Sequence, residues 1–262
     1  MKSLNIVKIG GNVIDNQDAL NEFILAFSKL EGYKLLVHGG GKIATKMAEN
    51  LHLKTKMIEG RRITDDHMID VITMTYGGLI NKKIVSQMQC YGINAVGLSG
   101  ADGNLILSEK RSKKDDIDFG WVGDPKQVNG KWLRSLIMEE LVPIIAPLTH
   151  DGKGNLLNTN ADTIANVVGV ALSSFFDVSI NYCFELNGVL EDIHNQSTLI
   201  KDITYEKYQI LKKNGVIVQG MVPKLENAFD AIQKGVKGVR IMNHRSISKL
   251  EKEYYDEFTT IH

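Results

Sequence analysis

Lysines and glycines are the residues of this sequence whose types and spacing suggest chemistry. Lys8 lies near the end of a short apolar segment and is followed by Gly10 and Gly11. A second apolar segment, Tyr33–His38, is followed by Gly39-Gly40-Gly41. A glycine loop between a strand and a helix lets an anion approach the unpaired N–H groups at the helix start. Ligands of open parallel sheets bind at the carboxyl ends of the strands, so two such loops predict one phosphate-binding crevice. The triplet alone also fits a tight turn.

Two further charged residues lie at the start of predicted helices. Asp162 follows a polar turn that begins at Asn158, and an apolar segment comes after it. Lys224 follows a loop that contains glycine and proline and begins at Gly220. Each has a simpler interpretation, because Asp162 can cap a helix or serve as a first-turn acid, and Lys224 can be a solvated surface residue.

Known nucleotide-binding motifs fit the glycine triplet less well. A P-loop needs a glycine five residues before the Gly-Lys pair and Ser or Thr after it, whereas Leu36 and Ile43 occupy these positions. Residues 39–44 match the dinucleotide fingerprint after a strand, and Glu59 lies near the expected acidic position. This match gives the charged residues no role, so an NAD-binding oxidoreductase is kept as an alternative of a different class.

Cysteines and histidines do not form the clusters that metal sites and disulfide frameworks need. Cys90 and Cys183 lie far apart, and the histidines are scattered along the chain. We expect both cysteines to be buried thiols and no metal to be bound by the protein itself. His38 adjoins the glycine triplet and is expected to be a buried residue that supports this loop.

Strands and helices alternate in the predicted secondary structure. The apolar patterns predict strands at 4–9, 33–38, 94–98, 141–147, 178–184 and 238–242, β-like segments at 57–64 and 104–130, and helices from Asp15 to about 30 and at 42–51, 65–91, 163–172, 205–213 and 224–234. This order favours an α/β fold, a three-layer sandwich around an open, mainly parallel sheet. Because there are only four prolines and no linker, we expect two lobes that share one continuous sheet, the second starting near Ser173.

The composition excludes several classes of partner. The 262 residues include 31 Lys+Arg and 31 Asp+Glu, so no global charge attracts nucleic acid or an anionic membrane. The longest uncharged apolar segment, 163–176, is shorter than the roughly 20 residues of a membrane span. The N-terminal apolar segment is too short for a signal peptide. We therefore expect a cytoplasmic protein without nucleic-acid or membrane partners.

Taken in order, six segments resemble the amino-acid kinase family, and specifically its acylglutamate branch. They are Lys8-Ile9-Gly10-Gly11, His38-Gly39-Gly40-Gly41, Gly60-Arg61-Arg62-Ile63-Thr64-Asp65, Val96-Gly97-Leu98-Ser99-Gly100, Asn158-Thr159-Asn160-Ala161-Asp162 and Gly220-Met221-Val222-Pro223-Lys224. The resemblance implies the amino-acid kinase fold and ATP-dependent phosphorylation of the γ-carboxylate of N-acetyl-L-glutamate to N-acetyl-L-glutamyl 5-phosphate, in arginine biosynthesis. It also implies an acylglutamate-binding and dimerisation lobe, residues 1–172, and a nucleotide-binding lobe, residues 173–262.

The same resemblance gives roles to single residues. Lys8 and Lys224 match the lysines that contact the transferring phosphoryl group, and Asp162 matches the carboxylate that orients both. The matches for nucleotide binding are Gly10, Gly11, Gly40 and Gly41, and those for binding the acylated amino acid are Gly40, Arg62, Asn158 and Asn160. Arg61 is as eligible as Arg62 from the sequence alone, and either can be a surface charge.

These roles agree with the chemistry of the reaction. A carboxylate nucleophile is already ionised at neutral pH, so the reaction needs no general base. Phosphoryl transfer to it depends mainly on positioning and on neutralising charge, which lysines and backbone amides provide. An arginine fork suits the carboxylate of the acceptor. Mg²⁺ is expected to be held mainly by the nucleotide phosphates.

Departures from the family leave alternatives open. Phe184-Glu185 stands where the family usually has Thr-Asp near the nucleotide, and Phe258-Thr259-Thr260-Ile261 lacks the usual Gly-Thr pair. The extra N-terminal helix of arginine-inhibited hexameric relatives is missing, which favours a homodimer. N-succinyl-L-glutamate is kept as an alternative acceptor, with Lys54, Lys56 and Arg61 near enough in sequence to bind its added carboxylate. Glutamate 5-kinase and a nucleotide-binding regulator without catalysis are also kept.

Overall fold

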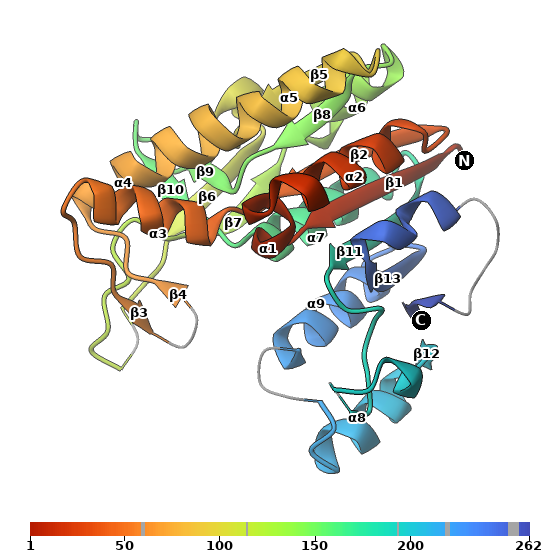
Figure 1. Ribbon diagram of the computed structural model, residues 1–262. Helices are drawn as coiled ribbons and strands as arrows, with labels where there is room; N and C mark the ends of the chain where they lie inside the picture. Colours follow the sequence, from red (N-terminus) through yellow and green to blue (C-terminus); the bar gives the residue numbers. More distant parts are fainter. Residues whose placement is uncertain (59–60, 114, 193, 218–220, 251–256) are drawn as a thin grey trace.

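The main feature of the computed structural model, which describes residues 1–58, 61–113, 115–192, 194–217, 221–250 and 257–262, is an eight-stranded sheet (Figure 1). Its strand order is β12-β14-β13-β11-β1-β2-β8-β5. The pairing is parallel except between β13 and β14, which run antiparallel. The bounds of these strands are β1 Ser3–Ile9, β2 Tyr33–His38, β5 Ala95–Leu98, β8 Val142–Ile145, β11 Asp177–Phe184, β12 Asp202–Ile203, β13 Gly238–Asn243 and β14 Thr259–Ile261.

Helices cover both faces of this sheet and bury one apolar cluster on each face (Figure 1). One face packs against α6 Gly130–Met138, α7 Ala161–Leu172, α8 Tyr205–Lys213 and α9 Val222–Gln233. The other packs against α1 Gly11–Asp15, α2 Gln17–Ser28, α3 Gly41–Asn50, α4 Asp66–Ile72, the π-helix η1 Thr73–Ile80, α5 Asn81–Cys90 and the 3₁₀ helix η4 His244–Lys249. The three-layer α/β architecture and the mainly parallel sheet expected from the sequence are confirmed.

Alternation along the strands decides which face each side chain joins. On β1, Leu4 and Ile6 enter the cluster under α7, whereas Val7 and Ile9 enter the cluster under α2. Successive residues of a strand point to opposite faces. Lys8 therefore projects toward the α7 face although it lies inside a buried strand.

Two helix starts differ from the sequence expectation or refine it. The helix expected from Asp15 to about 30 is α2, which Asn16 caps by accepting from the N–H groups of Asp18 and Ala19, and a separate short helix that was not expected, α1, ends at Asp15. Asx side chains suit this capping position, so the expectation chose the wrong neighbour. Asp65 caps α4 as a helix-start acid, and α4, η1 and α5 follow one another without a break over the predicted 65–91.

The sheet is not the only one in the described chain. A four-stranded sheet has the order β10-β9-β6-β7, with β6 Ile106–Lys110, β7 Gly123–Val128, β9 Leu148–His150 and β10 Leu156–Asn158. The antiparallel strands β3 Met57–Ile58 and β4 Arg61–Arg62 pair with each other beside α3 (Figure 1). Short 3₁₀ helices are η2 Asp102–Asn104 and η3 Gln196–Thr198. The expected large, mainly parallel sheet is confirmed. Within the second sheet, β6 and β7 lie in the β-like segment expected at 104–130, whereas β9, β10, β12 and β14 were not expected.

The two cysteines differ in exposure. Cys183 is a buried thiol, whereas Cys90, at the end of α5, is exposed, so the expectation of two buried thiols is wrong for Cys90. Position 90 lies on the solvent side of an amphipathic helix, where one polar face is expected. None of the helices formed by the described residues has both the length and the apolar composition needed to cross a bilayer.

Candidate active site

Three charged side chains from separate parts of the chain meet at one point. Lys8 Nζ lies 2.7 Å from Asp162 Oδ1, and Lys224 Nζ pairs with Asp162 Oδ2. The side chains of Lys8 and Asp162 are 12% and 11% exposed, and that of Lys224 is 29% exposed. One carboxylate therefore holds two ammonium groups in a partly enclosed place, which leaves one formal positive charge to attract an anion.

The elements around this point explain why the groups meet. Lys8 leaves β1 toward α7, and Asp162 lies in the first turn of α7, whose start is capped by Asn160 Oδ1 accepting from the N–H of Asp162 at 2.7 Å. Lys224 lies in the first turn of α9, which has proline in its opening turn and packs against α7. Asn160, and not Asp162, is the cap, so the carboxylate of Asp162 stays available to the lysines.

Burial and neighbouring charges set the protonation of this group. Burial alone would raise the pKa of Asp162, but the ammonium groups of Lys8 and Lys224 hold that pKa well below its ordinary value. Burial lowers the pKa of Lys224, Asp162 partly offsets this effect, and repulsion from Lys8 adds to it. Asp162 is therefore ionised at neutral pH.

The two glycine loops lie side by side next to the lysines. The N–H of Gly10 donates to Cys183 O at 3.0 Å and that of Gly39 to Ile9 O at 3.2 Å. A Cβ atom on Gly11 would lie 3.9 Å from the nitrogen of Gly41, so the starts of α1 and α3 face each other. Helix starts of this kind attract anions through their free N–H groups.

Gly40 is required by its position. Its φ is +145°, and a Cβ atom there would lie 2.3 Å from Ile80 Cδ1. Close packing against η1 and the backbone conformation both exclude a side chain. His38, directly before the loop, is fully buried, with Nδ1 2.8 Å from Gly39 O and Nε2 3.2 Å from Asn81 Nδ2. The expectation that His38 is buried beside the loop is confirmed.

A cleft of about 390 Å³ connects the loops with the lysines. Its lining residues come from the carboxyl ends of β1 and β11 and from the starts of α1, α3 and α9: Lys8, Gly10, Gly11, Asn12, Gly41, Lys42, Tyr182, Cys183, Phe184, Glu185 and Lys224. Phe184-Glu185, where the sequence departs from the family pattern, thus borders the same cleft. The cleft has the place and the lining of a site for a phosphorylated ligand.

Arg62 and Arg61 differ in burial. Arg62 is 7% exposed, and its Nη2 donates to Gly41 O at 2.9 Å and to Thr45 Oγ1 at 2.7 Å, whereas Arg61 is exposed. Arg62 Nη1 is buried and has no hydrogen-bond partner among the described residues. A buried guanidinium nitrogen without an acceptor is costly unless a ligand supplies one. Arg62 is therefore the better candidate for binding a carboxylate. Gly60, which precedes the two arginines in the matched segment, lies outside the described residues.

The other predicted binding residues have protein contacts of their own. Asn158 Nδ2 donates to Thr64 Oγ1 at 3.0 Å, which links β10 to the segment after Arg62. Asn160 caps α7 as described. Within the described residues no group of three or more His, Cys, Asp or Glu could hold a metal ion. Tyr182 and Asn166, which lie beneath Asp162, could not be predicted as site residues, because tyrosine in a strand and asparagine in a helix carry no motif.

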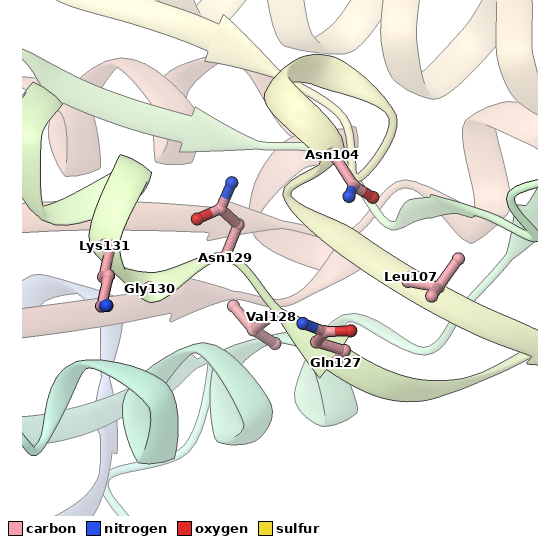
Figure 2. Close-up of a pocket in the computed structure, with 7 residues that line it drawn as sticks. All are labelled: Asn104, Leu107, Gln127, Val128, Asn129, Gly130 and Lys131. Atoms are coloured by element: carbon pink, nitrogen blue, oxygen red, sulfur yellow. The ribbon is translucent and has the colours of Figure 1, made fainter.

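A second hollow of about 400 Å³ lies elsewhere (Figure 2). Amide side chains of Asn104, Gln127 and Asn129 border it at the start of α6 (Figure 2). Gly130 packs there against Ala171, at the end of α7 opposite to Asp162. This hollow contains none of the predicted site residues, and Lys131 is the one charged residue in its lining. This hollow therefore offers fewer positively charged side chains for binding a phosphorylated ligand than the cleft beside Lys8 and Lys224 does.

Comparison with known proteins gives a consistent result. The sequence model of the amino acid kinase family matches residues 3–243. Acetylglutamate kinase of Cytophaga hutchinsonii is 49% identical over 97% of this chain and 96% of its own length. Acetylglutamate kinase of Phocaeicola vulgatus is 51% identical over 92% of this chain and 93% of its own length. In fold, the chain resembles carbamate kinase of Giardia lamblia, with a TM-score of 0.71 at 13% identity over 99% and 98% of the two chains. These matches favour a kinase over the NAD-binding alternative, whose Glu59 lies outside the described residues.

Proposed function

The chain belongs to the amino acid kinase family, and from this membership we propose that it transfers the γ-phosphoryl group of ATP to the γ-carboxylate of N-acetyl-L-glutamate. The products are ADP and N-acetyl-L-glutamyl 5-phosphate, an intermediate of arginine biosynthesis. As a member of this family the protein is a phosphotransferase that uses ATP. Relatives that are about half identical over nearly their whole length and carry the name acetylglutamate kinase support N-acetyl-L-glutamate as the acceptor.

The observation that carries the proposal is the meeting of Lys8 and Lys224 on Asp162. The acceptor carboxylate and the phosphoryl group are both anionic, so the main barrier is to bring them together. Lys8 and Lys224 reach the transferring group from β1 and from α9 and neutralise the charge that develops on its oxygens. Asp162, itself ionised at neutral pH, keeps both ammonium groups pointed at this place.

The nucleotide occupies the cleft beside the glycine loops. Backbone N–H groups at Gly11, Gly40 and Gly41 hold its phosphate oxygens, as the free N–H groups of helix starts do, and Gly10, whose own N–H donates to Cys183 O, lines the cleft beside them. Mg²⁺ is held mainly by the phosphates, since Asp162 is committed to two lysines and Mg²⁺ keeps few protein ligands in such sites. The ion supplies charge neutralisation on the nucleotide phosphates.

The acceptor binds next to α3 and β4. Arg62 presents its unpartnered Nη1 to the α-carboxylate, while its Nη2 is anchored by Gly41 and Thr45. Asn158, at the end of β10, and Asn160, the cap of α7, contribute amide groups, and Gly40 contributes backbone contacts near the γ-carboxylate. This arrangement orients the acceptor for in-line attack on the phosphoryl group.

The remaining assignments concern the whole molecule. Residues 1–172 form the lobe that binds the acylglutamate and dimerises, and residues 173–262 form the lobe that binds the nucleotide. A homodimer is supported by β5, whose outer edge has no strand partner among the described residues, and by Met74, which is 53% exposed on η1. The free thiols Cys90 and Cys183 support a reducing cytoplasmic setting.

A hydroxamate assay tests the proposed reaction, because hydroxylamine traps acyl phosphates. We expect ATP-dependent hydroxamate with N-acetyl-L-glutamate, and at least tenfold less with N-succinyl-L-glutamate and free L-glutamate at equal concentration. A preference for N-succinyl-L-glutamate would change the acceptor. ATP binding without turnover of any of the three would overturn the proposed function in favour of a regulator.

A further inference from the structure

Tyr182 lies directly beneath the three charged groups. It is opposite Lys8 in the parallel register of β1 and β11, and its ring belongs to the apolar cluster on the α7 face. Residues paired in register point to the same face of a sheet. The ring of Tyr182 therefore stands next to the Lys8 side chain, between the sheet and the start of α7.

The hydroxyl of Tyr182 is bonded to the same helix that carries Asp162. It donates to Asn166 Oδ1 at 2.5 Å, and the backbone oxygen of Asp162 lies 3.4 Å away. Asn166 and Asp162 are four residues apart, about one turn of α7. A buried hydroxyl group needs only one hydrogen-bond partner, and any neighbouring element could supply it. Here both nearby acceptors belong to the turn of α7 that positions the carboxylate of Asp162.

The ring of Tyr182 also contacts the charged groups. Lys224 Nζ lies 5.9 Å from the ring centroid, within the range of a cation–π interaction. Tyr182 is 2% exposed and nevertheless borders the cleft. Burial and the nearby carboxylate of Asp162 raise the pKa of Tyr182 well above its ordinary value, so its hydroxyl remains a neutral donor.

We propose that Tyr182, held by Asn166, is a positioning residue for phosphoryl transfer. Its hydroxyl fixes the first turns of α7, and its ring keeps Lys224 over the cleft when the phosphoryl group draws both lysines away from Asp162. This inference rests on the proposed function, because it assigns Tyr182 a part in the same transfer. The residue acts through Asp162 and Lys224.

Three variants isolate the hydroxyl. Tyr182→Phe keeps the ring and removes the donor, Asn166→Ala removes the acceptor, and the double variant removes both. We expect each single variant to lower kcat about tenfold, as for the loss of one well-placed hydrogen bond, with the KM values for ATP and acceptor within about twofold of wild type. The double variant should lose no more than either single variant, because both break the same bond. The matched control is Tyr33→Phe, at the amino end of β2, where the hydroxyl accepts from Lys2 Nζ at 2.8 Å and no loss of kcat is expected.

A fourth variant isolates the ring. Tyr182→Leu keeps an apolar side chain and removes the face near Lys224. Without the ring the ammonium form of Lys224 is less stabilised, so the alkaline limb of the kcat profile should move to lower pH in Tyr182→Leu and stay in place in Tyr182→Phe. An unchanged limb in Tyr182→Leu would overturn the role of the ring.

Amide hydrogen exchange keeps this inference separate from the proposed reaction. In the unliganded protein, Tyr182→Phe should speed exchange in the first half of α7, from Thr163 to Asn166, and leave α2 unchanged. Unchanged kcat, whether or not exchange is faster, would overturn the positioning role. If the wild-type protein failed to phosphorylate N-acetyl-L-glutamate, the proposed function would be overturned. In that case, unchanged exchange in Tyr182→Phe would also overturn the inference, whereas faster exchange would support the contact by which Tyr182 stabilises α7.

Discussion

Replacing Asp162 by Asn tests whether the cluster of Lys8, Asp162 and Lys224 depends on the carboxylate at its centre. The change removes the one negative charge that faces Lys8 at 2.7 Å and Lys224, and it keeps the size of the side chain. Breaking a buried ion pair costs about 3–5 kcal/mol. Because the Lys224 side chain is 29% exposed and regains part of its hydration, we expect the free energy of unfolding to fall by about 3 kcal/mol at pH 7.

The same substitution should slow the reaction. Two lysines without their shared carboxylate repel each other and lose their common direction. We expect kcat to fall about 100-fold, equivalent to about 2.7 kcal/mol of transition-state stabilisation. The stability loss should also depend on pH, because the folded-state pKa of Asp162 is held below its ordinary value. The difference in unfolding free energy between wild type and Asp162→Asn is fully present above about pH 4 and shrinks as the pH falls through the folded-state pKa.

Urea unfolding followed by circular dichroism measures the first effect, and steady-state kinetics of the folded protein measure the second. Thr204→Ala provides a matched control, since it removes the cap of α8 and should cost about 1 kcal/mol of stability without lowering kcat. A folded Asp162→Asn protein with kcat within twofold of wild type would refute the reasoning. Loss of stability without any kinetic defect would assign Asp162 to helix stability alone.

Four other variants extend the test. Lys8→Ala and Lys224→Ala should each lower kcat at least 100-fold and change the acceptor KM less than threefold, and initial-rate kinetics that show intact kcat would remove the residue from the transfer. Arg62→Lys should raise the acceptor KM at least tenfold with little change in the KM for ATP, because the bidentate fork is lost; a rise for ATP alone would place Arg62 at the nucleotide. Burial lowers the pKa of His38 from 6.5 to about 4, so the unfolded chain takes up a proton before the folded one does. The free energy of unfolding should therefore fall by roughly 3 kcal/mol from about pH 6.5 to about pH 4 in wild type, and His38→Asn should lack this part of the slope in urea titrations.

Short-range rules predict where the residues of the central geometry lie in their elements, whereas the meeting of Lys8, Asp162 and Lys224 is expected only from the resemblance to the amino-acid kinase family. Lys8 stands in an apolar strand where alternation fixes its face, and Gly10-Gly11 marks the end of this strand. Asp162 and Lys224 each lie in the first turn of a helix, a position that capping residues and proline indicate. The order of strands and helices then requires a parallel sheet, which brings the loops to one edge.

Other features depend on packing that no local pattern contains. Asp15 and Asn16 are both suitable caps, and only the break between α1 and α2 selects Asn16. Arg61 and Arg62 are adjacent and identical in type, so the pairing of β3 with β4 decides which one is buried. The short strand β14 is separated from its partner β12 by many residues, and its pairing carries no signal in the sequence around it.

A crystal structure with ADP, aluminium fluoride and N-acetyl-L-glutamate tests most directly whether both lysines serve one phosphoryl group. The fluoride complex imitates the transferring group in mid-reaction. We expect Lys8 Nζ and Lys224 Nζ each to lie within about 3 Å of its fluorine atoms, from opposite sides, with Asp162 behind both. A complex in which either ammonium group stays away from the fluoride, with both substrates bound, would contradict this expectation.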